Sequence, residues 1–141
     1  MIDSKPLVDV SLILQGEELD PVQVTALLKV NGTKMRRKGE KWRTSNNNEV
    51  TSKTGVWALD AYRDSMDLHD QISSLRQQLS NSKCEPLRLP GVQSAVIDMF
   101  IAFGSSERVD DNYECQLTSD DLKWISGLGV PVSFTISYVP S

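Results

Sequence analysis

The sequence has few of the residues from which metal sites and many active sites are built. Its 141 residues include two cysteines and one histidine. A structural zinc site usually needs four ligands, which Cys84, Cys115 and His69 cannot supply. Cysteines without a secretory signal are typical of reduced thiols, although a disulfide between these two stays an alternative. We expect neither a metal site nor a cofactor.

Long apolar runs are also missing. The start, MIDSKPLVDV, lacks the basic segment and apolar segment of a signal peptide. No run reaches the roughly 18 apolar residues of a membrane span. We therefore expect a cytoplasmic protein with no membrane contact. The length is that of one domain, so we expect a single domain over residues 1–141.

Motifs for phosphate-binding loops, dinucleotides, zinc proteases and calcium loops are absent as well. His69, in DLHDQ, could act as a base flanked by Asp67 and Asp70, but no nucleophile or second base accompanies it. We interpret it as an exposed surface histidine. The two thiols have no histidine nearby in sequence, which argues against a cysteine hydrolase without excluding one. We expect no catalytic residues and no enzyme activity.

The sequence does have an uneven charge. Its net charge is −4, but residues 34–43 carry +5 and the rest carries −9. The cations of this basic stretch are Lys34, Arg36, Arg37, Lys38, Lys41 and Arg43. Acidic residues recur at Asp60, Asp64, Asp67 and Asp70, in ERVDDNYE (107–114), and at Asp120 and Asp121. Such a distribution of charge is evidence about the binding partners of the protein rather than about its fold.

Apolar periodicity predicts five strands. They are LVDVSLILQ (7–15), TGVWALDAY (54–62), SAVIDMFIAFG (94–104), YECQL (113–117) and VPVSFTISYV (130–139). The third is apolar on both faces, which predicts a central strand covered on both sides or one at an edge of the helix layer. We expect the fourth to form a hairpin with the third. In the last strand, the residues expected to face the core are Val132, Phe134, Ile136 and Tyr138.

Three helices are predicted from caps and apolar stripes. The first begins at Asp20-Pro21 and stops at Asn31-Gly32, the second runs from about Asp67 to Ser80, and the third begins with a capping box of Thr118 and Asp121 and ends at Gly127 or Gly129. The order of elements predicts an α+β two-layer sandwich. We expect a mostly antiparallel sheet of about five strands with three helices packed mainly on one face.

The basic stretch has no period, and we interpret it as a turn around Lys38-Gly39 followed by an Asn-rich loop (44–54). It is a solvated loop, a surface for a protein partner, or a site for nucleic acid or a phosphate ligand. The last alternative would use Arg36, Arg37, Lys38, Lys41, Trp42 and Arg43. Trp42 can stack on a base or a partner, or fold back over the sheet beneath aliphatic stems of its neighbours.

Several local features occur together: Leu19 and Pro21 at a helix start, the Lys38-Gly39 turn, Gly55-x-Trp57 in a strand, and Leu122 to Gly129 before the last strand. In this pattern, over about residues 7–139, the chain resembles the bacterial domain-of-unknown-function family 4279. The resemblance implies a small α+β protein without established catalytic residues. Some relatives look like immunity proteins of toxin–immunity systems, as in contact-dependent growth inhibition, which bind and block a cognate toxin.

An immunity role implies a contact surface for the toxin. If the toxin is a nuclease, its cleft is basic, and an acidic patch can occupy it as a phosphate mimic. The candidate partner-binding residues are Glu107, Asp110, Asp111 and Glu114, followed by Asp64, Asp67 and Asp70. We therefore expect a non-enzymatic immunity protein, with nucleic-acid or phosphate-ligand binding as the alternative.

Overall fold

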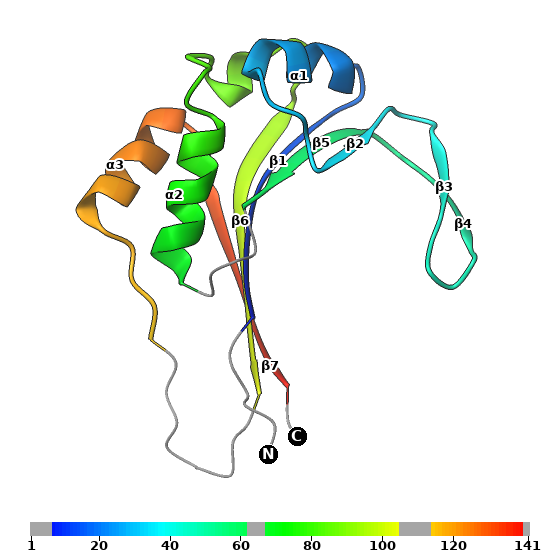
Figure 1. Cartoon of the computed structure of the whole chain (residues 1–141). Coiled ribbons are helices and arrows are strands. Elements are labelled where there is room, and N and C mark those ends of the chain that lie inside the picture. The colour runs from blue at the N-terminus through cyan, green and yellow to red at the C-terminus, as the bar shows by residue number, and fades with distance from the viewer. Residues whose placement is uncertain (1–6, 62–66, 105–113, 140–141) are drawn as a thin grey trace.

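The computed structural model describes residues 7–61, 67–104 and 114–139 (Figure 1). Its strands are β1 (Leu7–Gly16), β2 (Lys34–Arg36), β3 (Lys41–Arg43), β4 (Glu49–Thr51), β5 (Gly55–Asp60), β6 (Ser94–Gly104) and β7 (Val132–Val139). Its helices are α1 (Pro21–Leu28), α2 (Leu68–Gln78) and α3 (Ser119–Leu128), with a 3-10 turn η1 (Pro86–Arg88). None of the helices in these ranges is long and apolar enough to cross a membrane.

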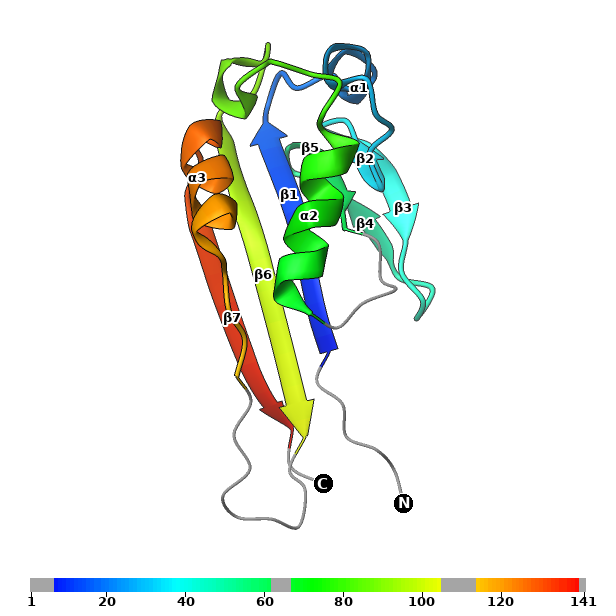
Figure 2. The same cartoon turned by 60° about the vertical axis from the view of Figure 1, so that its left-hand side comes forward.

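Five of the strands form one sheet in the order β2-β5-β1-β6-β7, and β3 pairs with β4 in a separate hairpin. All neighbours in the larger sheet are antiparallel except β6 and β7. The helices lie mainly on one face of the sheet (Figures 1 and 2). The predicted α+β fold, with a mostly antiparallel sheet, is therefore confirmed.

The core lies between this face and the helices. β1 alternates as predicted and buries Val8, Val10, Leu12 and Leu14. Leu14 stands opposite Trp57 of β5 and Ala95 of β6, so one buried layer crosses three strands. Trp57 is fully buried, and its indole N–H donates to Thr25 Oγ1 of α1 at 3.1 Å, which satisfies its one polar group.

A buried glutamine completes the sheet where β5 ends. β5 pairs with β1 only along Ser11–Gly16, and α2 lies in front of the remaining part of β1 (Figure 2). The side chain of Gln71 accepts a hydrogen bond from Val10 N–H at 2.9 Å and donates one to the carbonyl of Val8. The amide of Gln71 thus replaces a strand partner for these backbone groups.

Two predictions about local structure are wrong. Helix α1 ends at Leu28, earlier than Asn31-Gly32, because Lys29 adopts a left-handed conformation (φ 59°) and donates its N–H to Thr25 O. The region 34–54, predicted as a turn and a loop, contains the three short strands β2, β3 and β4. Strands of three residues are too short to show a period.

The predicted strand at 113–117 is also wrong. Residues 114–118 have no regular structure, and Tyr113 lies outside the described residues. β6 instead lies between β1 and β7, so both its edges are paired. Of the two alternatives predicted for β6, the central position is confirmed, but equal cover on both faces is wrong, because its burial alternates: Ala95, Ile97, Met99 and Ile101 are buried, and the residues between them are half-buried.

The inner face of the last strand differs most from expectation. Phe134, Ile136 and Tyr138 are 53%, 66% and 55% exposed. They share a face with the residues of β6 that point toward the helices, since Met99 pairs with Phe134 and Ile101 pairs with Ile136. However, β7 is the edge strand, and α3 lies only beside its start (Figure 2). The alternation of apolar residues predicted the correct face of β7, but it did not predict where the helix layer ends.

Candidate functional site

An open groove of about 720 Å³ lies at the N-terminal ends of α2 and α3. Its lining comes from the start of α2 and from the segment that leads into α3: Asp67, Leu68, His69, Glu114, Cys115, Gln116 and Thr118. We call it the α2–α3 groove. It brings together a histidine, a thiol and two carboxylates from parts of the chain that are far apart in sequence.

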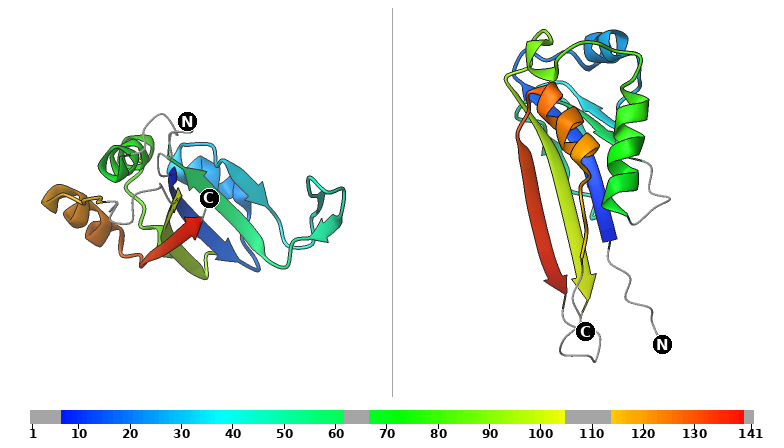
Figure 3. Two further views of the ribbon diagram at one scale, coloured as in Figure 1. Left: turned by 90° about the horizontal axis from the view of Figure 1, so that it is seen from below. Right: turned by 90° about the vertical axis from the view of Figure 1, so that its left-hand side faces the viewer.

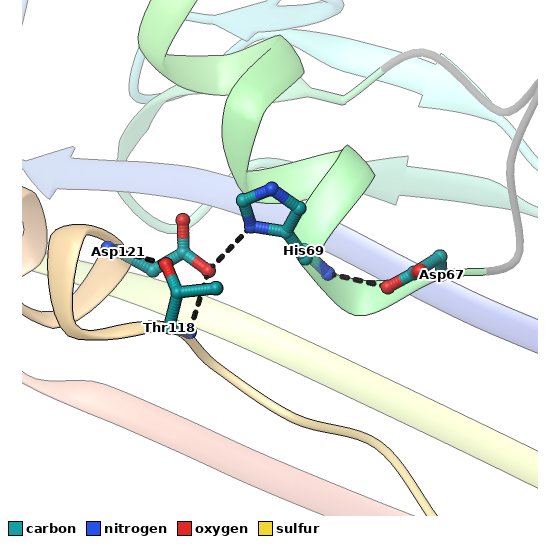
Figure 4. Close-up of polar contacts among 4 residues, drawn as sticks. All are labelled: Asp67, His69, Thr118 and Asp121. Carbon is teal, nitrogen blue, oxygen red and sulfur yellow. Dashed lines mark hydrogen bonds and ion pairs between the residues drawn. The ribbon is translucent and has the colours of Figure 1, made fainter.

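A hydrogen bond between the two helices orients the histidine (Figure 4). His69 Nδ1 lies 2.7 Å from Asp121 Oδ2. The same carboxylate oxygen accepts the Thr118 N–H at 2.9 Å, and the Asp121 N–H donates to Thr118 Oγ1 at 3.1 Å. This is the predicted capping box of α3, now confirmed. The cap therefore holds Asp121 in place while Asp121 holds His69.

The two side chains differ in exposure, with 43% for His69 and 5% for Asp121. The hydrogen bond and charge of Asp121 raise the pKa of His69 above 6.5, and the charges of Asp70 and Asp67 act in the same direction. Burial acts to raise the pKa of Asp121, but the hydrogen bonds from His69 and Thr118 outweigh it, so this pKa lies below 3.8. The pair is a charged link between α2 and α3 in mildly acidic solution.

His69 is an exposed surface histidine, as interpreted from the sequence, but it also has a partner that the sequence did not indicate. Its side chain is partly covered, and its main partner is Asp121, which is 52 positions away rather than a flanking residue. The bond to Nδ1 leaves Nε2 as the ring nitrogen for another partner. Cys115 is an exposed free thiol that lines the same groove as His69, although the two residues are far apart in the sequence.

The prediction about the thiols has a clear outcome. Cys84 and Cys115 are both free, as expected, so the alternative of a disulfide is wrong. Within residues 7–61, 67–104 and 114–139, no group of three or more His, Cys, Asp or Glu residues could hold a metal ion.

The acidic candidates fall into two sets. Glu114 and Asp67 line the α2–α3 groove, and Asp70 is exposed on the first turn of α2. Asp67 also caps α2, because its Oδ1 accepts the His69 N–H at 2.9 Å. The remaining candidates lie outside the described residues: Asp64, Glu107, Asp110 and Asp111. The structure thus brings three of the seven predicted residues to one end of the helix layer.

Most cations of the basic stretch have acidic partners within the fold. The ion pairs are Arg37–Asp20 at 2.8 Å, Lys38–Glu17 at 3.2 Å, Lys41–Glu49 at 3.5 Å and Arg43–Glu49 at 3.9 Å. Exposed pairs of this kind contribute only about 0–1 kcal/mol each to stability. Their effect is to neutralise the charge locally, so folding reduces the basic character that the sequence suggests.

Trp42 is half-buried on β3, and a cation covers it. The Cζ atom of Arg36, on β2, lies 3.6 Å from the centroid of the Trp42 ring, and Lys34 Nζ lies 5.9 Å away. The stacking partner of Trp42 is therefore the guanidinium group of Arg36, which joins the hairpin to the edge of the larger sheet. This contact occupies the aromatic face that a base would need.

Comparison with known proteins places the chain in a family. No curated protein and no solved structure matches it. A family model described as Domain of unknown function (DUF4279) matches residues 6–139, which is nearly the whole chain. The resemblance noted from the sequence is confirmed at this level, and the chain belongs to the DUF4279 family.

Proposed function

We propose that this protein is a non-enzymatic immunity protein that binds and blocks a protein toxin in the cytoplasm. The observation that supports the proposal best is the distribution of charge in the folded chain. Most cations of the basic stretch pair with acids of their own surroundings, and two acidic residues, Asp67 and Glu114, line the α2–α3 groove. The β3–β4 hairpin and the helices α2 and α3 lie at opposite ends of the molecule (Figures 1 and 3).

A surface of this kind fits a basic partner. Glu114 and Asp67 line the groove, and Asp70 is exposed on the first turn of α2. Carboxylates on a fixed scaffold can occupy the positions that phosphate groups take in the basic cleft of a nuclease, and they accelerate association through long-range attraction. A nuclease toxin is therefore the class of partner that this end of the molecule fits best.

The test is capture of the toxin from the native host, with charge variants as baits. The wild-type protein should retain one basic protein in stoichiometric amount. The bait Asp70→Lys/Glu114→Lys should lose it, while Glu40→Lys, on the opposite side of the molecule, should retain it. Asp67 stays unchanged because it caps α2. Circular dichroism checks that each bait is folded.

A growth assay then tests neutralisation. Expression of the captured protein alone should stop growth, and co-expression of the wild-type protein should restore it. Restoration should fail with Asp70→Lys/Glu114→Lys and succeed with Glu40→Lys. If no partner is retained, or if the captured protein is harmless when expressed alone, the immunity function is wrong.

A second candidate function is thiol-dependent hydrolysis. The observation in its favour is that Cys115 and the Asp121–His69 pair meet at one groove. A histidine held by a buried carboxylate can activate a neighbouring thiol. Cys84, an exposed thiol that lines a different pocket, provides an internal control.

Alkylation rates distinguish this candidate from the immunity proposal. If the chain is a thiol enzyme, iodoacetamide should modify Cys115 much faster than Cys84 at neutral pH, and His69→Gln should remove the difference. The immunity proposal predicts similar rates for the two thiols, unaffected by His69→Gln. Mass spectrometry of the two cysteine peptides measures both rates in one sample.

A further inference from the structure

The edge strand β7 lacks the features by which proteins usually protect an edge. Exposed edges tend to be short, charged or interrupted by proline, because their free backbone groups can pair with another chain. β2, the opposite edge, is three residues long and carries Lys34 and Arg36. β7 is eight residues long, VSFTISYV, with no charged residue and no proline. No strand among the described residues pairs with its outer side.

β7 also exposes apolar side chains on the face that carries the helices. Phe134, Ile136 and Tyr138 are each more than half exposed. The ring of Tyr138 contacts the ring of Phe103, with 5.5 Å between the centroids, so the row continues onto β6. An unpaired edge beside an apolar row is a surface suited to an added strand.

We propose that β7 pairs in antiparallel orientation with β7 of a second copy of this chain, about a two-fold axis at Thr135. This register pairs seven of the eight residues of the strand. Opposite one another stand Val132 and Tyr138, Phe134 and Ile136, Ser133 and Ser137, and the two copies of Thr135. Apolar residues meet apolar residues on one face, and hydroxyl groups meet hydroxyl groups on the other.

The charge of the chain favours a second copy as the partner of β7. Each copy has a net charge of −4, so most surfaces of the chain would repel their own copy. The uncharged β7 places no like charges opposite one another when it pairs with itself. An isologous two-fold contact is also the commonest way in which identical chains associate.

The same symmetry covers the uncovered end of the strand. Figure 2 shows α3 beside the start of β7, while the end that carries Tyr138 extends beyond it. In an antiparallel pair, the start of the second strand lies beside the end of the first. The α3 helix of the second copy therefore approaches the end of the strand that carries Ile136 and Tyr138. This contact adds buried surface area to that of the strand pair. The added area matters because a stable interface usually buries about 1,200–2,000 Å².

Sedimentation equilibrium of the wild-type protein and two variants tests the proposal. The wild-type protein should have twice the chain mass of 15.7 kDa. Thr135→Lys places two like charges opposite each other at the axis and should give a monomer. Val22→Lys adds the same charge at an exposed position of α1 and should leave the dimer intact. Circular dichroism checks that both variants are folded.

A cross-link tests the register itself. In a background with Cys84→Ser and Cys115→Ser, Thr135→Cys should form a disulfide-linked dimer on oxidation, whereas Val22→Cys should not. A wild-type protein that stays monomeric at millimolar concentration would overturn the proposal and leave the edge to an extended segment of another protein. A dimer that persists in Thr135→Lys would overturn it too, because another surface would then hold the copies together.

Discussion

Gln71 is only 1% exposed, yet its amide group makes hydrogen bonds with the backbone of a strand. Gln71→Ala would leave Val10 N–H and the carbonyl of Val8 buried without these partners. We expect a loss of about 2–4 kcal/mol in the free energy of unfolding, since each buried unsatisfied group costs about 1–3 kcal/mol. Urea denaturation measures the loss. Gln77→Ala, at an exposed position of the same helix, should change stability by less than about 0.5 kcal/mol.

The His69–Asp121 pair should make stability depend on pH. Folding raises the pKa of His69, so its contribution is fully present below the unfolded value of 6.5 and is lost as pH rises through the folded pKa. Folding lowers the pKa of Asp121, so its contribution is lost as pH falls below 3.8. The pair should therefore stabilise the protein most between these two values.

Unfolding of His69→Gln against the wild-type protein checks this dependence. The wild type should exceed the variant in stability by more at about pH 5.5 than at about pH 8.5. His69 is the one histidine of the chain, so its NMR titration is unambiguous and should give a pKa above 6.5. Asp121→Asn should lower this pKa. If the wild type and His69→Gln differed in stability by the same amount at both pH values, the prediction would be wrong, and the hydrogen bond between His69 and Asp121 would not be an ion pair.

At the scale of elements, two glycines should respond to alanine in opposite directions. A Cβ atom at Gly16, the last residue of β1, would lie 1.8 Å from the carbonyl oxygen of Gly91. Gly16→Ala should therefore destabilise the fold by about 1–3 kcal/mol. A Cβ atom at Gly127, within α3, meets nothing within 4 Å, so Gly127→Ala should stabilise it by about 0.5–1 kcal/mol. Thermal unfolding of both variants measures whether each is less stable or more stable than the wild-type protein.

Elements with a long period or a strong cap were predictable from the sequence. β6 occupies residues 94–104 as predicted, and the capping box places the start of α3. The strands β2, β3 and β4 were not predictable, because each is too short for a period and depends on its partner strand. The exposure of Phe134 depends on where the helix layer ends, which alternation along one strand does not encode.

The candidate site was predictable only in part for a related reason. The sequence indicates Asp121 as a capping residue, because a cap needs only neighbours along the chain. The contact of Asp121 with His69 depends on how α2 and α3 pack, and no local pattern reports that packing. The same holds for the groove that joins Cys115 to His69.

At the scale of the whole molecule, folding changes the meaning of the basic stretch. Nucleic-acid binding requires cations that are available to phosphates, and here most are paired in a chain of net charge −4. We expect no retardation of single-stranded or double-stranded oligonucleotides at low salt, and no effect of Arg36→Ala/Arg37→Ala. Retardation that this double variant abolishes would instead favour the nucleic-acid alternative.

The association rate with the captured toxin reports on the acidic surface at the α2–α3 groove. Charge attraction acts over about 8 Å at physiological salt and further in dilute buffer, so steering depends on ionic strength. The rate constant should fall steeply as salt is added to the wild-type protein and to Glu40→Lys. It should be lower, and less dependent on salt, for Asp70→Lys/Glu114→Lys. An equal rate constant for all three proteins at low salt would contradict toxin binding at this surface.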